Sequence, residues 1–209
     1  MPDKRIRELT VPLFYFSLME ILQFFSYFYI NECGLYQNQF LTFLSYVHIC
    51  LQPIFFNMMY MYFIPIKVKN KIQSYVYGLS FLMCAFMFMR LIPFQGSAIC
   101  TSGQLLCGQN FCSMSGNWHI AWEVPLYNLP IIGHIPNYFL AVFVLPLLYG
   151  SWRALLVGSI FGPVVAYLST TNQNEMPAIW CLFSVFLFLV VMNTRFINLL
   201  KVNELTLIS

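Results

Sequence analysis

Several side chains that can hold a proton or a metal ion fall inside apolar stretches of the chain. Glu20 lies near the middle of the first apolar run and Gln23 follows three residues later, so both project from one face of a helix. His48 lies at a similar depth in the second run, with Gln52 one turn further on. Placing a charged side chain at mid-bilayer costs about 2.5 to 3.5 kcal/mol on insertion scales. We therefore expect Glu20 and His48 to face each other across a polar chamber.

A second group lies in the segment Gly116–Pro125. His119 and Glu123 are four residues apart, so they share one face if the segment is helical, and Trp118 and Trp122 share the adjacent face. An imidazole and a carboxylate on one face can bind a divalent metal at the membrane rim. A simple surface pair of the two side chains is the alternative.

Arg90 and His134 lie at the ends of later apolar runs, on the same side as these groups. The Arg90 guanidinium is the natural countercharge for Glu20 or Glu123. The expected catalytic residues are Glu20, His48 and Glu123, the expected metal ligands are His48, His119 and Glu123, and the expected substrate-binding residues are Gln23, Gln52, Arg90 and His134.

These groups predict an outward-opening polar pocket. A divalent ion held there, zinc first, would lower the pKa of a bound water and give a metal-dependent hydrolase of a lipid-like substrate. Proton passage or solute binding is the alternative, which gives a transporter or a ligand-binding membrane protein with a protonatable Glu/His site. Retinal is not expected, because no lysine lies within an apolar run. Haem and nucleotides are not expected either, because only His48 is deep and no phosphate-binding glycine loop occurs.

Helices must position these groups, because the composition is that of a membrane protein. Apolar residues make up 60% of the chain and charged residues 8%, against roughly 25% charged in soluble domains. Six stretches can cross about 30 Å of hydrocarbon as helices. They are Leu13–Ile30, Phe40–Ile64, Ile72–Ile92, Ile131–Tyr149, Ala154–Thr170 and Ala178–Thr194. Trp118–Pro130 contains two prolines and is expected to be an outer interfacial or re-entrant helix. The prediction is an all-α, polytopic transmembrane bundle that forms one domain over residues 1–209.

The basic residues orient this bundle. Nine of the ten lysines and arginines fall on one side if the six runs alternate across the membrane: Lys4, Arg5, Arg7, Lys67, Lys69, Lys71, Arg153, Arg195 and Lys201. Basic residues beside membrane spans stay cytoplasmic. Both termini are therefore expected in the cytoplasm. The net charge of +3 then needs no nucleic-acid partner, and membrane lipids are the expected surroundings.

The cysteines divide between loops and spans. Four lie in the proposed outer loops: Cys33, Cys100, Cys107 and Cys112. Their even number suggests two disulfides, in one of three pairings, that staple the loop of residues 93–117 as a cap in an oxidising compartment. A metal knuckle is the alternative, although no CxxC pair occurs. Cys50, Cys84 and Cys181 are expected to be apolar packing residues within spans.

Gly158 and Gly162 have the GxxxG spacing of closely packed membrane helices. Their expected partner is another helix of the same chain, and a homodimer through this face is the alternative.

Six stretches of the chain resemble a family of small, functionally uncharacterised multispanning proteins of bacteria and large DNA viruses. They are SLMEILQFFSY (Ser17–Tyr27), HICLQPIFFN (His48–Asn57), MYFIP (Met61–Pro65), SGNWHIAWEVP (Ser115–Pro125), VLPLLYGSWR (Val144–Arg153) and PAIWCLFS (Pro177–Ser184). A partial resemblance links Glu20, Gln23, Ser26, Ser45 and His48 to the intramembrane metal hydrolase superfamily that includes alkaline ceramidases, and it implies metal-dependent hydrolysis. The chain departs from that pattern, because the aspartate after the histidine and the late HxxxH pair are absent.

Overall fold

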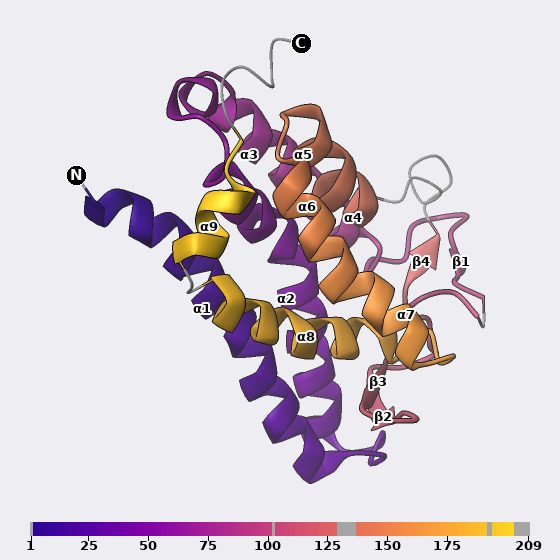
Figure 1. The fold of residues 1–209 in the computed structure, drawn as a ribbon. Helices are drawn as coiled ribbons and strands as arrows, with labels where there is room; N and C mark the ends of the chain where they lie inside the picture. The colour runs from indigo at the N-terminus through magenta and orange to yellow at the C-terminus, as the bar shows by residue number, and fades with distance from the viewer. Residues whose placement is uncertain (1, 102, 129–136, 192–193, 203–209) are drawn as a thin grey trace.

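The computed structural model describes residues 2–101, 103–128, 137–191 and 194–202. Three long helices come first (Figure 1): α1 (Pro2–Ser26), which runs on into a short 3-10 turn at Tyr27–Tyr29, α2 (Tyr36–Met61) and α3 (Ile66–Met89). Four short strands follow: β1 (Ala98–Ile99), β2 (Cys112–Ser115), β3 (Ile120–Glu123) and β4 (Tyr127–Asn128). The later helices are α4 (Asn137–Phe139), α5 (Leu145–Leu148), α6 (Trp152–Ser159), α7 (Val165–Ser169), α8 (Met176–Val191) and α9 (Thr194–Leu200).

Four helical stretches of the described chain are long and apolar enough to cross a membrane, so the expected six spans are not supported. They are Glu8–Tyr29, Tyr36–Met61, Ile66–Met89 and Trp152–Ser169. The helix at Asn137–Leu148 is shorter, and α8, with 16 described residues, ends beside residues 192–193, which lie outside the described residues. Residues 131–136, which open the fourth predicted span, lie outside the described residues. The fold is that of a helical membrane protein, with the coarse class confirmed and the number of spans corrected.

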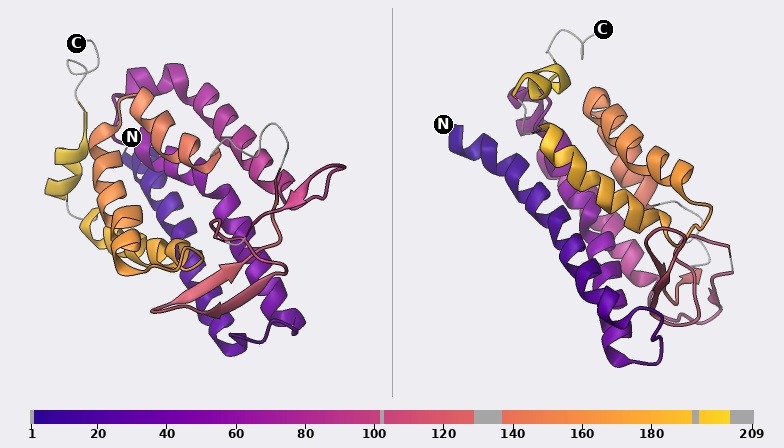
Figure 2. Two further views of the ribbon diagram at one scale, coloured as in Figure 1. Left: turned by 90° about the vertical axis from the view of Figure 1, so that its right-hand side faces the viewer. Right: turned by 60° about the horizontal axis from the view of Figure 1, so that its bottom comes forward.

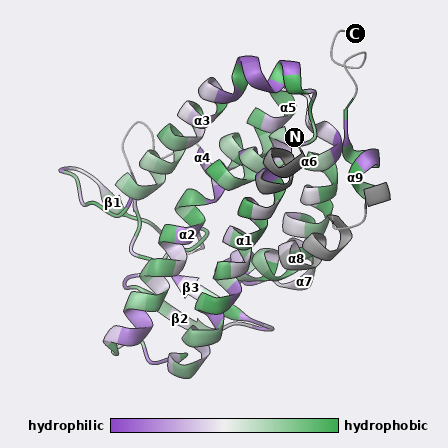
Figure 3. Cartoon of the chain, turned by 90° about the vertical axis from the view of Figure 1, so that its left-hand side faces the viewer, coloured by the Kyte–Doolittle hydropathy of each residue, from purple (hydrophilic) through white to green (hydrophobic). Residues whose placement is uncertain are grey.

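Large apolar side chains face outward along these helices. Phe14, Phe81 and Leu168 are among the exposed ones, and Figure 3 shows hydrophobic residues along most of the helical surface, with hydrophilic ones gathered towards helix ends. Inside the bundle, α1 packs on α2, α2 packs on α3, and α8 packs on α1 and α7. Helices that are apolar on both their inward and their outward faces are typical of helices that lie in lipid.

Two prolines fall where the later helices change their winding. Residues Leu140–Val144, just before Pro146, and Ile160–Val164, which contain Pro163, are π-helical and join the α-helical pieces on either side. A proline has no N–H to donate to the carbonyl four residues back, so the helix loses one backbone hydrogen bond and its regular α-helical winding is disturbed there. The winding therefore changes near Pro146 and Pro163, whereas α2 continues as an α-helix through Pro53.

The two glycines of the GxxxG pair pack against side chains of their own chain. A Cβ added at Gly158 would meet the Tyr60 hydroxyl, and one at Gly162 would meet the Trp180 indole. The expected packing within the chain is thus observed. A homodimer through this face stays a prediction.

The segment 118–130 was expected to be helical, and this prediction is wrong for residues 118–128, the part that the structure describes. Strand β3 pairs antiparallel with β2, and β4 pairs with β1. The alternate residues Ile120, Trp122 and Val124 belong to one buried hydrophobic cluster, whereas Ala121 is buried outside it, and this alternation is the period of a strand. Pro125 also prevents an unbroken helix. We call the described residues between 90 and 128 the cap.

Both predicted disulfides form, and the structure selects one of the three pairings. Cys33 joins Cys112, which ties the α1–α2 loop to strand β2, and Cys100 joins Cys107 within the cap. Asn38 of α2 adds a reciprocal pair of hydrogen bonds, because its Nδ2 donates to the Ser113 carbonyl and its Oδ1 accepts from the Ser113 N–H, both at 2.9 Å. Cys50, Cys84 and Cys181 are free and buried, as expected.

The N-terminal end of α1, the start of α3 and helix α9 lie at the opposite end of the bundle from strands β2 and β3 (Figures 1 and 2), and most of the basic residues belong to these segments. The Arg153 guanidinium donates to the Leu199 and Lys201 carbonyls there. The expected loop at residues 65–71 is instead the start of α3, and Lys69 is buried in a 2.5 Å ion pair with Glu8 of α1. The two ends of the bundle therefore differ, with the disulfides at one end and the lysines at the other.

Candidate ligand-binding site

A cavity of about 520 Å³ lies between the cap and the helices. Residues 104–106 and 126 of the cap line it, together with residues of α2, the end of α3, α4, the π-helical segments, α7 and α8. Its volume falls within the roughly 300–1,000 Å³ of small-molecule sites. Leu105 and Phe139 both line the cavity and are 51% and 52% exposed, so it reaches the surface at the cap and beside α4.

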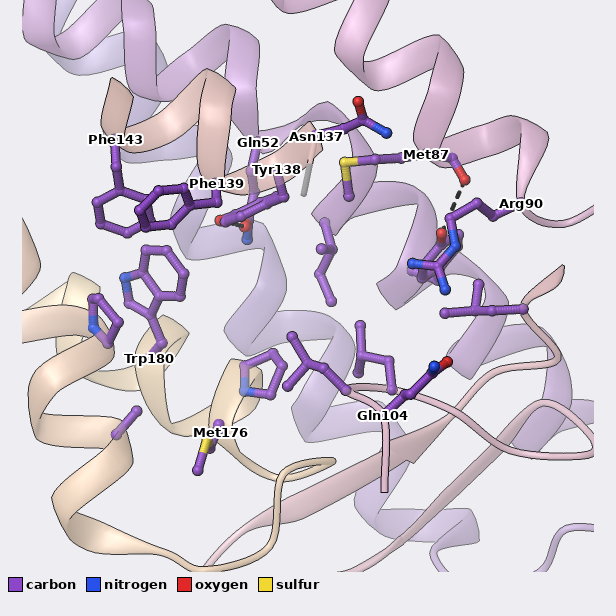
Figure 4. Close-up of a pocket in the computed structure, with 18 of the residues that line it drawn as sticks. Gln52, Met87, Arg90, Gln104, Asn137, Tyr138, Phe139, Phe143, Met176 and Trp180 are labelled. Atoms are coloured by element: carbon purple, nitrogen blue, oxygen red, sulfur yellow. Dashed lines mark hydrogen bonds between the residues drawn. The ribbon is translucent and has the colours of Figure 1, made fainter. Parts of the chain in front are cut away.

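Arg90 marks one end of the cavity (Figure 4), at the C-cap of α3. Its backbone carbonyl accepts a hydrogen bond from the Tyr127 N–H, which fixes the helix end to strand β4. Its side-chain Nε is buried and has no hydrogen-bond partner among the described residues. Arg90 was expected to pair with Glu20 or Glu123. Neither ion pair is found among the described side chains, where the ion pair joins Lys69 and Glu8.

Gln52 lies in the middle of the cavity wall and links it to the bundle interior. Its Oε1 accepts a 2.6 Å hydrogen bond from the Tyr138 hydroxyl, and its Nε2 lies 3.5 Å from His48 Nδ1. His48 Nε2 lies 2.8 Å from the Tyr15 carbonyl, which can only accept. These partners fix the neutral tautomer with the proton on Nε2. His48 is therefore held in the core by two partners and does not line the cavity.

Aromatic rings form the other end. Phe139 and Phe143 stack with centroids 5.1 Å apart, and Trp180 lies 5.8 Å from Phe143 and edge-on to Tyr138 at 5.5 Å. Figure 4 shows this group across the cavity from Arg90, with Gln52 and Tyr138 between. The cavity thus has a charged end and an aromatic end.

Glu20 and Gln23 lie outside this cavity and do not meet His48. Glu20 Oε1 and both amide atoms of Gln23 are buried without hydrogen-bond partners among the described residues. The ring of Tyr15 covers His48, with stacked centroids 4.1 Å apart. The chamber expected between Glu20 and His48 is therefore not observed.

The expected metal ligands are not brought together. His119 Nδ1 lies 2.6 Å from the Tyr27 hydroxyl, at the end of the first span, whereas Glu123 lies in strand β3 opposite Cys112. The helical spacing that was expected to join them does not exist, because four residues of a strand span about 13 Å. No group of three or more His, Cys, Asp or Glu side chains in the described ranges could hold a metal ion. His134, expected to bind substrate, lies outside the described residues.

Glu175 lies between the predicted spans Ala154–Thr170 and Ala178–Thr194, and the structure buries it. The side chain is fully buried just before α8, and its carboxylate accepts backbone hydrogen bonds from Asn117, Trp118 and His119 at 2.5 to 3.0 Å and one from the Thr170 hydroxyl at 2.6 Å. Desolvation by itself would raise the pKa of this carboxyl, but the four hydrogen bonds outweigh it and the pKa is lowered.

His119 responds to the same surroundings. Burial lowers the pKa of its imidazole, and the Glu175 carboxylate opposes that shift. The neutral ring can then accept a hydrogen bond from the Tyr27 hydroxyl at Nδ1. The turn at residues 116–119 is thus held by Glu175 on one side and α1 on the other.

Comparison with known families places the chain. A family of unknown function (DUF5765) matches residues 2–201, so the chain belongs to that family. No curated protein and no solved structure matches the chain significantly.

Proposed function

We propose that this family member is a ligand-binding membrane protein whose cavity under the cap takes up a small molecule. The observation that carries the proposal is Arg90, whose charged side chain lines an otherwise largely apolar cavity and has no ion-pair partner among the described residues. A ligand with an acceptor group would gain a charge-assisted hydrogen bond from the guanidinium, which is stronger than a bond between neutral groups. Gln52 and Arg90 were both expected to bind substrate, and both line the cavity.

The orientation proposed for this protein places the cap outside and the basic end in the cytoplasm. Two disulfides fit an oxidising compartment, and the lysines at the start of α3 fit the cytoplasmic face. The cavity would then open outward. Passage of a ligand across the membrane remains a prediction. Metal-dependent hydrolysis also remains a prediction, and the described side chains include no group that could hold the metal ion.

Filling the cavity tests the proposal. Leu105 lines the cavity and is exposed, so a Leu105→Trp substitution should narrow the cavity mouth without disturbing the core. Leu148 is 77% exposed and does not line the cavity, so Leu148→Trp adds the same bulk elsewhere. Native mass spectrometry of protein purified from membranes should show a bound small molecule in the wild type and in Leu148→Trp, and less of it in Leu105→Trp. Equal occupancy in all three, or none in the folded wild type, would refute cavity binding.

A further inference from the structure

We infer that the ligand is an amphiphile with one hydrocarbon chain and an anionic head, a carboxylate or a phosphate, with the head at Arg90 and the chain among the aromatic rings. This inference rests on the proposed function and specifies its ligand. Among the described residues that line the cavity, Arg90 is the one that carries a formal charge. The described lining contains no carboxylate that would neutralise this charge.

The neighbours of Arg90 suit an anion. Gln104 and Asn128 of the cap, and Asn137 of α4, line the cavity and carry amide groups that can donate hydrogen bonds. A guanidinium binds carboxylate and phosphate oxygens through parallel N–H bonds, which are stronger than bonds between neutral groups. The head of an anionic ligand would therefore meet donors at this end and no repelling acid.

The opposite end suits a hydrocarbon chain. Trp180, Phe143 and Phe139 present ring faces and edges, and Pro163 and Ala166 add apolar contact. Phe139 is 52% exposed beside α4, so the cavity also opens at a face of the bundle that is rich in apolar side chains. A chain can enter there directly from lipid while its head stays near the cap. A small, fully polar anion would leave this half of the cavity unfilled.

Trp180 provides a direct readout, because bromine atoms on a hydrocarbon chain quench an indole that they touch. Protein in phosphatidylcholine nanodiscs is titrated with a dibrominated stearate and, separately, with its methyl ester, which has the same chain and no charge. We expect saturable quenching by the acid, at least about tenfold weaker binding of the ester, and loss of the signal in Trp180→Phe. Unlabelled oleate and lysophosphatidate then compete with the acid, and the stronger competitor identifies the head as carboxylate or phosphate.

The Arg90 variants complete the test. Arg90→Gln should weaken binding of the acid by about 10- to 100-fold and leave the ester unchanged, whereas Arg90→Lys should keep part of the affinity. Arg153→Gln, at the other end of the bundle, should bind as the wild type does. Equal binding of acid and ester, with no effect of Arg90→Gln, would overturn the anionic head and leave cavity binding intact. Absence of saturable quenching by either compound would overturn this ligand class, and the occupancy measurement with Leu105→Trp would still judge the cavity itself.

Discussion

At Glu175, a buried carboxylate receives four hydrogen bonds, three of them from consecutive backbone amides. Backbone amides in such a turn form a concave site for an anion. Gly116 makes the approach possible, because a Cβ at that position would collide with the Glu175 carboxyl. One side chain therefore joins the β2–β3 turn to the start of α8.

Replacing Glu175 should destabilise the cap. In Glu175→Gln, an amide N–H₂ takes the place of an oxygen that accepts from N–H or O–H donors, so one donor is left facing another. We expect a loss of about 1.5–3 kcal/mol, the scale of hydrogen bonds to a charged group, measured as a lower Tm of the detergent-solubilised protein. Glu32→Gln is the matched control, because Glu32 is exposed in the α1–α2 loop.

The same carboxylate predicts a pH dependence. Since the pKa of Glu175 is lower in the folded state, its stabilisation is present above its ordinary pKa and is lost as pH falls through the folded value. Acidification should therefore lower the Tm of the wild type more than that of Glu175→Gln, and the two curves should converge. Parallel curves across the acidic range would show that Glu175 does not titrate with folding.

At the scale of elements, the two disulfides close chain segments of very different length. Cys33 and Cys112 are 79 residues apart, whereas Cys100 and Cys107 are 7 apart. The chain-entropy model gives the longer closure about 2 kcal/mol more stabilisation. The double variant Cys33→Ser with Cys112→Ser should therefore lower the Tm more than Cys100→Ser with Cys107→Ser, when both are measured under identical non-reducing conditions that keep the remaining disulfide formed. The reverse order would contradict this account.

Helix packing at Gly162 predicts that an added methyl group lowers the stability of the protein there, whereas the same change at Gly78 should not. Gly162→Ala places a methyl group against the Trp180 indole, and overpacking of this kind costs about 1–3 kcal/mol. Gly78 lies in α3 with nothing within 4 Å of an added Cβ, so Gly78→Ala should be neutral or gain up to about 1 kcal/mol from helix propensity. Thermal unfolding of both variants checks the pair, and a Gly162→Ala protein as stable as the wild type would show that Trp180 can move aside.

These elements show what the sequence could reveal. Hydropathy identified the first three long helices and the helix of residues 152–169, and the disulfide-forming cysteines were identified from their even number and their position in the predicted outer loops. The alternation of Ile120, Trp122 and Val124 was available as a strand signal, but the helical spacing of His119 and Glu123 was preferred. Glu175 could not have been assigned, because its partners at 117–119 are more than 50 residues away and offer backbone groups that no side-chain pattern reveals.

At the scale of the whole molecule, polarity runs along the bundle. The disulfides and strands lie at one end, and Lys69, Arg153 and the chain segment around Lys201 lie at the other. Arg90 is the cation placed at the cap end, where it lines the cavity. This arrangement is what oriented insertion with a cytoplasmic basic end would require.

Cysteine labelling can test that orientation, because the three free cysteines are buried and the other four are paired. Gln95 lies exposed in the cap and Asn70 lies exposed at the start of α3, so Gln95→Cys and Asn70→Cys each add one reachable thiol at opposite ends. In intact cells, a membrane-impermeant maleimide should label Gln95→Cys, and it should label Asn70→Cys only after permeabilisation. The unsubstituted protein should stay unlabelled in both conditions. Labelling of Asn70→Cys alone in intact cells would invert the proposed orientation, and with it the side from which the cavity is reached.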